Sequence, residues 1–268
     1  MSTSRRTFIR TAVAGAAAPV FGPRLLDGLE RRLEAYQVMP PASAATDEAF
    51  WREVRKAFPP HPDYINLENG YSSPQPMPTW DAFQRHEQAV NNGLSFYMRR
   101  RRAADYASVK QQLAALAGCP ADEIAITRNT TESLGTVIHG IDLEPGAEAV
   151  MCDQDYGTML EQFRQQARRR GLRCVEISVP LRPRDDQEMV DTYARAITPR
   201  TKLLLLSHMI NITGQILPVR KIADMAHARG VAVIVDAAHS FAQLVFSVPD
   251  LDGDYLGASL HKWLCTPL

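Results

Sequence analysis

The fold is decided by a stretch near the end of the chain, Val231-Ala-Val-Ile-Val-Asp236-Ala-Ala-His239-Ser240, followed by Asp254-Tyr-Leu-Gly-Ala-Ser259-Leu-His261-Lys262-Trp263. Residues 231–235 are apolar and mostly β-branched, and Gly230 precedes them, which is typical of a buried parallel strand. Asp236 would then lie at the carboxyl end of this strand. The run at 255–258 predicts another strand, after which come a hydroxyl, an imidazole and an amine. In open α/β sheets, ligands bind at this edge.

The acid and the lysine in these two runs suit one kind of chemistry. A lysine amine forms a Schiff base readily when burial or nearby cations lower its pKa, because the free amine is then populated. Sites for pyridoxal phosphate (PLP) pair such a lysine with a carboxylate that keeps the ring nitrogen protonated. The sequence therefore predicts a PLP site in which Lys262 and Asp236 are the catalytic pair.

A junction rich in hydroxyls lies earlier in the chain, where a strand expected at 124–127 leads through Asn129-Thr130-Thr131-Glu132-Ser133 into a helix. The first turn of a helix carries free N–H groups and the positive end of the helix dipole, so such a junction binds phosphate readily. The alternative is an ordinary capping box, in which Asn129 or Thr130 caps the helix and Glu132 or Ser133 reaches back. The two interpretations are compatible.

These segments resemble the cofactor site of the class V (fold type I) PLP-dependent family, which includes cysteine desulfurases, kynureninases and isopenicillin N epimerase-like proteins. The resemblance rests on Val-Asp-Ala-Ala-His at 235–239, Ser-Leu-His-Lys at 259–262, the Thr-Glu turn at 131–132, and a Ser-His-x-x-Asn-x-x-Gly segment at 207–214. It covers the chain from about residue 64 onward. The turn at 129–132 and an export signal at the N-terminus are closest to the isopenicillin N epimerase-like branch.

The resemblance implies a role for each residue. Lys262 would form a Schiff base with PLP and, once an amino-acid substrate displaces it, act as the base for the Cα proton. Asp236 would stabilise the protonated ring nitrogen. The other cofactor contacts would be phosphate binding by Thr131 with Thr130 beside it, Ser259 and His261, stacking on the ring by Tyr156, and contact with the phenolic oxygen by Asn211 and His239. Epimerisation, transamination and desulfurase or lyase chemistry remain open, and the full-length protein is expected to be a homodimer.

Plainer interpretations exist for the same residues. Asp236 could cap a helix after a strand, and Lys262 could be a solvated surface lysine. Tyr156 could be a core or rim tyrosine, and Asn211 a turn residue before a glycine. Asn69-Gly70-Tyr71 could contact substrate or form a plain turn. The competing function is a truncated PLP-fold protein that binds the cofactor or a partner without turnover.

Length and composition exclude several classes. With 268 residues, of which 45% are hydrophobic, the chain can bury the core of one large domain or little more. The 30 basic residues balance the 30 acidic ones, so nothing favours nucleic acid as a partner. Nucleotide-binding Gly-x-Gly-x-x-Gly and Gly-x-x-x-x-Gly-Lys loops and the Gly-x-Ser-x-Gly of serine hydrolases are missing. The four cysteines show no metal spacing, and a disulfide between Cys152 and Cys174 is left open.

The N-terminus resembles a twin-arginine export signal, with Arg5-Arg6-Thr7-Phe8-Ile9 before an alanine-rich apolar run that ends at Phe21. It predicts a periplasmic or secreted protein that loads PLP before export. The run is too short for a membrane anchor. A mitochondrial transit peptide is the alternative. We expect a signal and linker at 1–44, an N-terminal helix and arm at 45–75, and a partial PLP-binding large domain at 76–268.

The alternation of strands and helices from residue 124 onward predicts an α/β fold, a mostly parallel sheet with helices on both faces. Further strands are expected at 147–152, 173–179 and 202–206, and helices at 45–58, 80–90, 105–117, 187–197 and 219–229. In the family that the chain resembles, a further sheet strand and the small domain follow the lysine. We therefore expect a fragment or a truncated product, with unpaired ladder groups beside the strand at 124–127.

Overall fold

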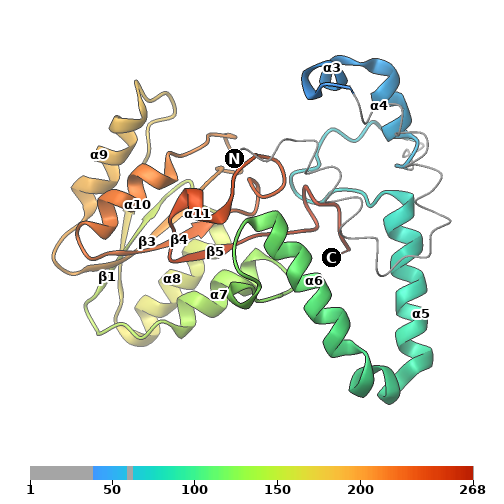
Figure 1. Cartoon of the computed structure of the whole chain (residues 1–268). Helices are drawn as coiled ribbons and strands as arrows, with labels where there is room; N and C mark the ends of the chain where they lie inside the picture. Colours follow the sequence, from blue (N-terminus) through green and yellow to red (C-terminus); the bar gives the residue numbers. More distant parts are fainter. Residues whose placement is uncertain (1–38, 59–62, 268) are drawn as a thin grey trace. The chain divides into compact units, whose positions relative to one another are not determined.

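The structure is a computed structural model of the chain and describes residues 39–58 and 63–267 (Figure 1). The chain divides into two compact units, one spanning Thr127–Trp263 and one made of the residues up to Ile126 together with Leu264–Leu268. Within the described ranges, no helix is long and apolar enough to cross a membrane. The twin arginines of the predicted export signal lie outside the described residues.

A parallel sheet forms the centre of the Thr127–Trp263 unit. Its order is β2-β1-β3-β4-β5, and every neighbouring pair is parallel. The strands are β1 (Glu148–Cys152), β2 (Arg173–Ile177), β3 (Thr201–Ser207), β4 (Ala232–Asp236) and β5 (Tyr255–Gly257). Each of these confirms a strand predicted from the sequence, with ends that differ by one or two residues. All the carboxyl ends therefore lie at one edge of the sheet.

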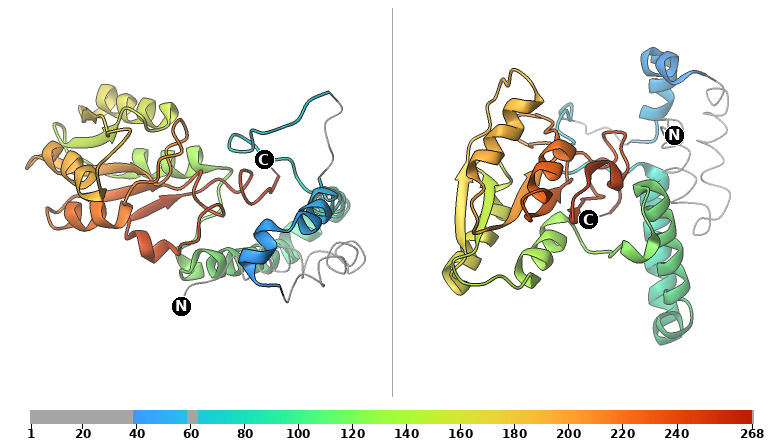
Figure 2. Two further views of the ribbon diagram at one scale, coloured as in Figure 1. Left: turned by 90° about the horizontal axis from the view of Figure 1, so that it is seen from above. Right: turned by 60° about the vertical axis from the view of Figure 1, so that its left-hand side comes forward.

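Helices cover both faces of this sheet, as Figures 1 and 2 show. One face packs against α7 (Thr130–Gly140) and α8 (Gly157–Arg170). The other packs against α9 (Asp186–Ala196), α10 (Val219–His227) and the short α11 (Val248–Leu251). The predicted α/β architecture with two covered faces is confirmed.

The leucine run of β3 shows why helices cover both faces of the sheet. Leu204 and Leu206 point into the core beneath α9 and α10, whereas Leu203 and Leu205 point into the core beneath α7 and α8. Each of the four is at most 1% exposed. Burying such a side chain contributes about 1.5–3 kcal/mol relative to leaving it in water. A strand that is apolar on both faces is stable only with helices on both sides.

The other unit is mainly helical. Its elements are α3 (Pro41–Thr46), α4 (Glu48–Arg55), α5 (Met77–Arg100), α6 (Arg102–Ala117) and the 3-10 turn η2 (Ala121–Glu123). The single helix predicted at 45–58 is divided, because the side chain of Asp47 accepts hydrogen bonds from the first turn of α4. Helix α5 is longer than predicted, and Leu94 interrupts it with φ 45°.

The strand predicted at 124–127 is wrong, and these residues form coil between η2 and α7. A strand requires neighbours that exchange ladder hydrogen bonds with it. Among the described residues the N–H of Ile126 instead donates to the hydroxyl of Tyr106 at 3.5 Å. A short β-branched run therefore misled the prediction, since its pairing partner decides whether such a run becomes a strand.

Cys152 and Cys174 lie on adjacent strands, but both are free thiols. Cys174 is paired in register with Ala149, three positions before Cys152. Cys152 packs in the core beneath α9 and α10, and Cys174 packs against the opposite core. The disulfide that the sequence left open is therefore absent, because the two side chains point to opposite faces of the sheet.

Candidate functional site

Asp236 is the last residue of β4 and is buried, with 6% of its surface exposed. Its Oδ1 accepts a hydrogen bond of 2.9 Å from the backbone N–H of Ala238. Burial raises the pKa of Asp236 above its ordinary value, and the Ala238 hydrogen bond and the positive charge of Lys262 offset part of that rise. The sheet edge thus holds a buried carboxyl group within electrostatic reach of an amine.

Backbone hydrogen bonds fix the end of β4 between its two neighbours. The N–H of His208, just past β3, donates to the carbonyl of Asp236 at 2.9 Å, and the N–H of Ala237 donates to the carbonyl of Gly257 in β5 at 2.8 Å. Asp236 also pairs in register with Ser207 on one side and with Gly257 on the other. The backbone at Asp236 is therefore held on both sides, which gives its side chain a fixed point of attachment.

Lys262 lies in the turn after β5, and its Nζ is 2.8 Å from Nε2 of His239. A charged lysine has only N–H donors, so Nε2 of His239 accepts and the proton of a neutral imidazole sits on Nδ1. His261, next to Lys262, is half-buried. Its pKa is lowered by burial and by the lysine charge, which favours the neutral ring. The structure brings Asp236, His239 and Lys262 together, as the sequence predicts.

Two hydroxyl groups meet at the start of α7. The Oγ1 of Thr130 and the Oγ of Ser259 are 2.7 Å apart, and the backbone N–H of Thr130 donates to the same Ser259 oxygen at 3.1 Å. Both residues are buried. Asn129 caps the helix through a 3.0 Å bond from the N–H of Glu132, and Glu132 accepts in return from the N–H of Arg128. The predicted capping and the predicted anion site occupy the same turn.

Close packing of β5 on α7 sets this hydroxyl pair in place. A Cβ at Gly257 would lie 2.6 Å from the side chain of Leu134 and 2.8 Å from Oγ of Ser133. Leu134 is fully buried, so it could make room only by displacing its own neighbours. Only glycine therefore fits at 257, and its small size lets the chain bring Ser259 to Thr130.

The remaining predicted residues are less constrained. Thr131 is half-buried beside Thr130, and its carbonyl accepts a 3.4 Å hydrogen bond from Gln162. Tyr156 is the residue before α8 and is 44% exposed. Asn211 lies in the exposed turn that follows β3. The described contacts do not join Tyr156 or Asn211 to Asp236 or Lys262, and their predicted roles stay predictions.

Asp155 belongs to the same edge, and the sequence argument did not select it. It is 3% exposed, its Oδ1 accepts from the hydroxyl of Ser207 at 2.6 Å, and its Oδ2 accepts from the N–H of Cys152 at 2.8 Å. Burial raises its pKa to about 7, and the charge of Asp236 adds to the rise. Its position three residues after a buried strand could have identified Asp155 from the sequence. The run Asp153-Gln-Asp155 is also typical of a polar turn, however, and was interpreted as one.

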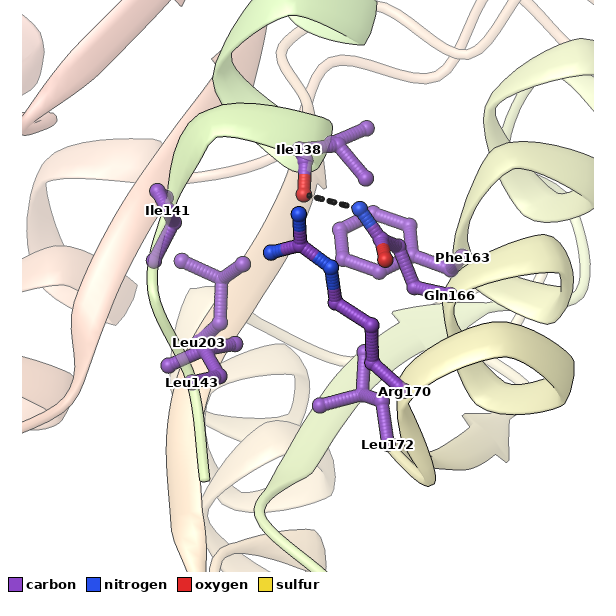
Figure 3. A pocket seen from close by; sticks show the side chains of 8 residues that line it. All are labelled: Ile138, Ile141, Leu143, Phe163, Gln166, Arg170, Leu172 and Leu203. Carbon is purple, nitrogen blue, oxygen red and sulfur yellow. Dashed lines mark hydrogen bonds between the residues drawn. The ribbon is translucent and has the colours of Figure 1, made fainter. Parts of the chain in front are cut away.

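A small apolar pocket between α7 and α8 lies apart from these residues (Figure 3). Gln166 donates there to the carbonyl of Ile138 at 3.0 Å. Leu203 in its wall belongs to the amino-terminal half of β3, whereas Asp236 and Lys262 mark the carboxyl edge of the sheet. The pocket is therefore a packing feature of the core and not part of the candidate site.

Comparisons with known proteins agree with this geometry. The aminotransferase class-V family model matches residues 66–268. An isopenicillin N epimerase of Streptomyces clavuligerus is 30% identical over 222 residues, which are 82% of this chain and 55% of that protein. A cysteine desulfurase of Haloferax volcanii is 29% identical over 212 residues, which are 76% of this chain and 49% of that protein.

Solved structures give the same fold. The cystine C–S lyase C-DES, solved with glycine covalently linked to its PLP cofactor, superposes with a TM-score of 0.74 at 24% identity, over 80% of this chain and 57% of that one. The cysteine desulfurase CsdA of Escherichia coli gives 0.68 at 26% identity, over 80% and 55%. The chain spans about half the length of the relatives it matches. With three quarters of its residues covered by the family model, the chain belongs to the aminotransferase class-V family.

Proposed function

We propose that this chain is the PLP-binding part of an enzyme that acts at the α carbon of an amino acid. The observation that carries the proposal is the arrangement at one sheet edge of a buried carboxyl group, a lysine amine and a pair of hydroxyls at a helix start. The membership of the family supports it.

The residues present fit this cofactor. A buried carboxyl group such as Asp236 needs a partner, because burial without one disfavours its charge. The protonated nitrogen of a pyridine ring would be such a partner. At the other end, the hydroxyls of Thr130 and Ser259 lie at the positive end of the α7 dipole and form a donor pair suited to a phosphate. The acceptor at Asp236 and the hydroxyl donors at the start of α7 thus match the two ends of the molecule.

PLP supplies an electron sink for negative charge that develops at the α carbon of a bound amino acid. Lys262 would hold the cofactor covalently through Nζ and, once released, would accept the α proton at that same atom. His239, 2.8 Å from the amine, orients Nζ and accepts a hydrogen bond from its charged form. Asp236 keeps a proton on the ring nitrogen. The contact of Lys262 with His239 and the electrostatic interaction of Lys262 with Asp236 support these assignments.

The other predicted residues complete the proposal. Thr131 and His261 flank the hydroxyl pair in sequence and would add donors to the phosphate. Asn211 would contact the phenolic oxygen together with His239, and Tyr156 would cover the face of the ring. An exposed aromatic face costs little conformational entropy to order, which suits Tyr156 to that task.

Epimerisation is the reaction that we favour. Removal of the α proton, its first step, needs a base, which Lys262 would provide, and an electron sink, which bound PLP would supply. The isopenicillin N epimerase of Streptomyces clavuligerus is also the most identical of the relatives described above. Desulfurase or lyase chemistry, as in the other relatives, is the second candidate. A PLP-binding protein without turnover is the third.

We also propose that the protein is exported and forms a homodimer. The twin-arginine pattern at the N-terminus supports export. Exposed apolar side chains on α5, among them Trp80, Leu94 and Phe96, support a partner surface, because exposed apolar area is where proteins associate.

Absorption spectroscopy tests the cofactor proposal. The protein with added PLP should show a visible band that borohydride bleaches and that Lys262→Ala abolishes. Lys221→Ala is the matched control, because that exposed lysine pairs with Asp186 on the surface and should leave the band unchanged. A colourless protein at excess PLP, or a band that survives in Lys262→Ala, would overturn the proposal.

Exchange of the α proton of added amino acids into deuterated water, followed by mass spectrometry, separates turnover from binding. Exchange that requires Lys262 supports an enzyme, and inversion of the α centre supports epimerisation. Release of sulfide or persulfide from cysteine or cystine would favour the second candidate. A coloured protein that exchanges no amino acid would support the third.

A further inference from the structure

Asp155 occupies the gap that opens between β1 and β3 beyond the end of their ladder. The register of these strands runs as far as Val150 opposite Leu204. Past that point the carboxyl group of Asp155 takes the place of a strand partner, accepting from the N–H of Cys152 and from the hydroxyl of Ser207. A neutral amide could fill this structural role as well, so the gap alone does not explain why an ionisable group is buried here.

A second buried carboxyl group lies one strand away. Ser207 pairs in register with Asp236, so the two acids flank one residue of β3, and each lies at the carboxyl edge of the sheet. Two like charges in a site of low dielectric disfavour each other, and one of the groups then keeps its proton.

We propose that Asp155 and Asp236 act as a coupled pair in which Asp155 holds a proton, so that the pair carries a single negative charge placed on Asp236. Asp155 is in this sense a positioning residue for the charge at the sheet edge. The effect of this charge on cofactor binding rests on the proposed function. The claim that Asp155 holds a proton does not depend on it.

The groups around the two acids favour a proton on Asp155 and a negative charge on Asp236. The groups that face Asp155 are Asp236 from β4, the Cys152 thiol at the end of β1, and the Tyr193 hydroxyl from α9. Burial raises the pKa of the thiol to about 12 and that of Tyr193 well above its usual range, so both stay neutral. The cation Lys262 acts on Asp236. Asp236 therefore has a partner that stabilises its charge, while Asp155 faces neutral groups and the acid Asp236.

The geometry at Asp155 accommodates either protonation state. Its 2.6 Å bond to Ser207 joins two oxygens, so a protonated Asp155 can donate to the hydroxyl as readily as a charged one accepts from it. The N–H of Cys152 needs an acceptor in both states, and Oδ2 provides it. Proton uptake thus requires no rearrangement of the turn.

Infrared spectroscopy of the cofactor-free protein tests the pair. The wild type should show the C=O stretch of a buried protonated carboxylic acid that disappears as the pH rises from about 5 to about 9, with a midpoint near the pKa of about 7. Asp155→Asn should remove this band. Its amide can accept from Cys152 and donate to Ser207, so the fold should persist. Asp153→Asn, at an exposed carboxyl group in the same turn, is the control and should leave the band in place.

Ser207→Ala provides a second test that does not depend on the stability of Asp155→Asn. The hydroxyl of Ser207 stabilises the charged carboxylate, so its removal should move the midpoint of the band to higher pH. A merely structural role for Asp155 predicts no titrating band and no shift. A band that Asp155→Asn leaves intact, or the absence of any such band in the wild type, would overturn the proposal.

The consequence for the cofactor is tested with PLP itself. In the wild type, the pH dependence of PLP affinity should contain a step near neutral pH that Asp155→Asn removes. If the protein binds no PLP at any pH, the proposed function fails, but the infrared result still shows whether Asp155 holds a proton. If PLP binds and the step survives in Asp155→Asn, the coupling to Asp236 is wrong.

Discussion

The hydroxyl oxygens of Thr130 and Ser259 lie 2.7 Å apart, although 129 positions separate the two residues in the sequence. One begins α7 and the other follows β5, so the contact forms only when the whole sheet is assembled. A phosphate held here would be bound by the finished fold and not by a local loop.

Ser259→Ala should weaken PLP binding by about tenfold to a hundredfold, because a hydrogen bond to a charged group is worth about 1.5–3 kcal/mol. It should also destabilise the cofactor-free protein by about 1–2 kcal/mol, since Thr130 loses a buried partner. Equilibrium titration with PLP and urea unfolding measure the two effects. Thr136→Ala, at an exposed hydroxyl on α7, is the control. An unchanged affinity for PLP would exclude the hydroxyl pair as a phosphate site.

Gly257→Ala should destabilise the protein by about 1–3 kcal/mol, because its Cβ would overlap the fully buried Leu134 in a closely packed core. It should also weaken PLP binding, since β5 cannot then bring Ser259 to α7. Gly140→Ala is the control, because a Cβ there meets no atom within 4 Å. Urea unfolding and PLP titration measure both changes. Equal stability of the two variants would contradict this packing argument.

The sequence predicts the sheet well because each strand is marked by its own residues. The all-apolar run 203–206 and the run ending at Asp236 fix strands, faces and the edge where ligands bind. The same reasoning fails at 124–127, because whether a short run becomes a strand depends on a neighbour that its own residues do not reveal.

In the candidate site too, the sequence finds what a local pattern marks and misses what depends on a neighbouring strand. Asp236 and Lys262 are found from the sequence because strand ends and their order place them at one edge. Asp155 is missed, because its burial follows from the divergence of β1 and β3, which no local pattern reports. Tyr156 and Asn211 were assigned by resemblance alone, and the exposure of both leaves their roles as predictions.

The exposed apolar side chains of α5 predict that the protein sediments as a dimer. Phe96→Ser should shift the equilibrium toward monomer, because Phe96 is 64% exposed beside other apolar residues of that helix and truncating an aromatic interface anchor costs about 2 kcal/mol or more. Leu181→Ser, at a 68% exposed leucine of a loop in the other unit, is the control. Sedimentation equilibrium measures both. A monomeric wild type, or a dimer that Phe96→Ser leaves unchanged, would show that α5 is not the interface.

Without cofactor, the free energy of unfolding of Asp236→Asn should exceed that of the wild type by an amount that grows as the pH rises. Burial raises the pKa of Asp236, so the folded protein holds this proton more tightly than the unfolded chain does. The stability that this provides is complete below the ordinary pKa of an aspartate and is lost as the pH rises through the folded value. Asparagine is neutral throughout, and its Oδ1 can still accept from the N–H of Ala238.

Urea unfolding of both proteins from about pH 4 to about pH 8 measures this difference, which should grow in favour of Asp236→Asn across the range. Asp224→Asn, at an exposed acid paired with Arg220, is the control and should show no such trend. The same variant should lose exchange of the α proton, because a neutral amide cannot hold the proton on the ring nitrogen. A variant that gains stability and loses chemistry is expected where a buried charge is kept for function. Parallel stability curves for the wild type and Asp236→Asn would show that burial does not disfavour the charged form of Asp236. The main physical reason for placing a cation beside this carboxyl group would then be gone.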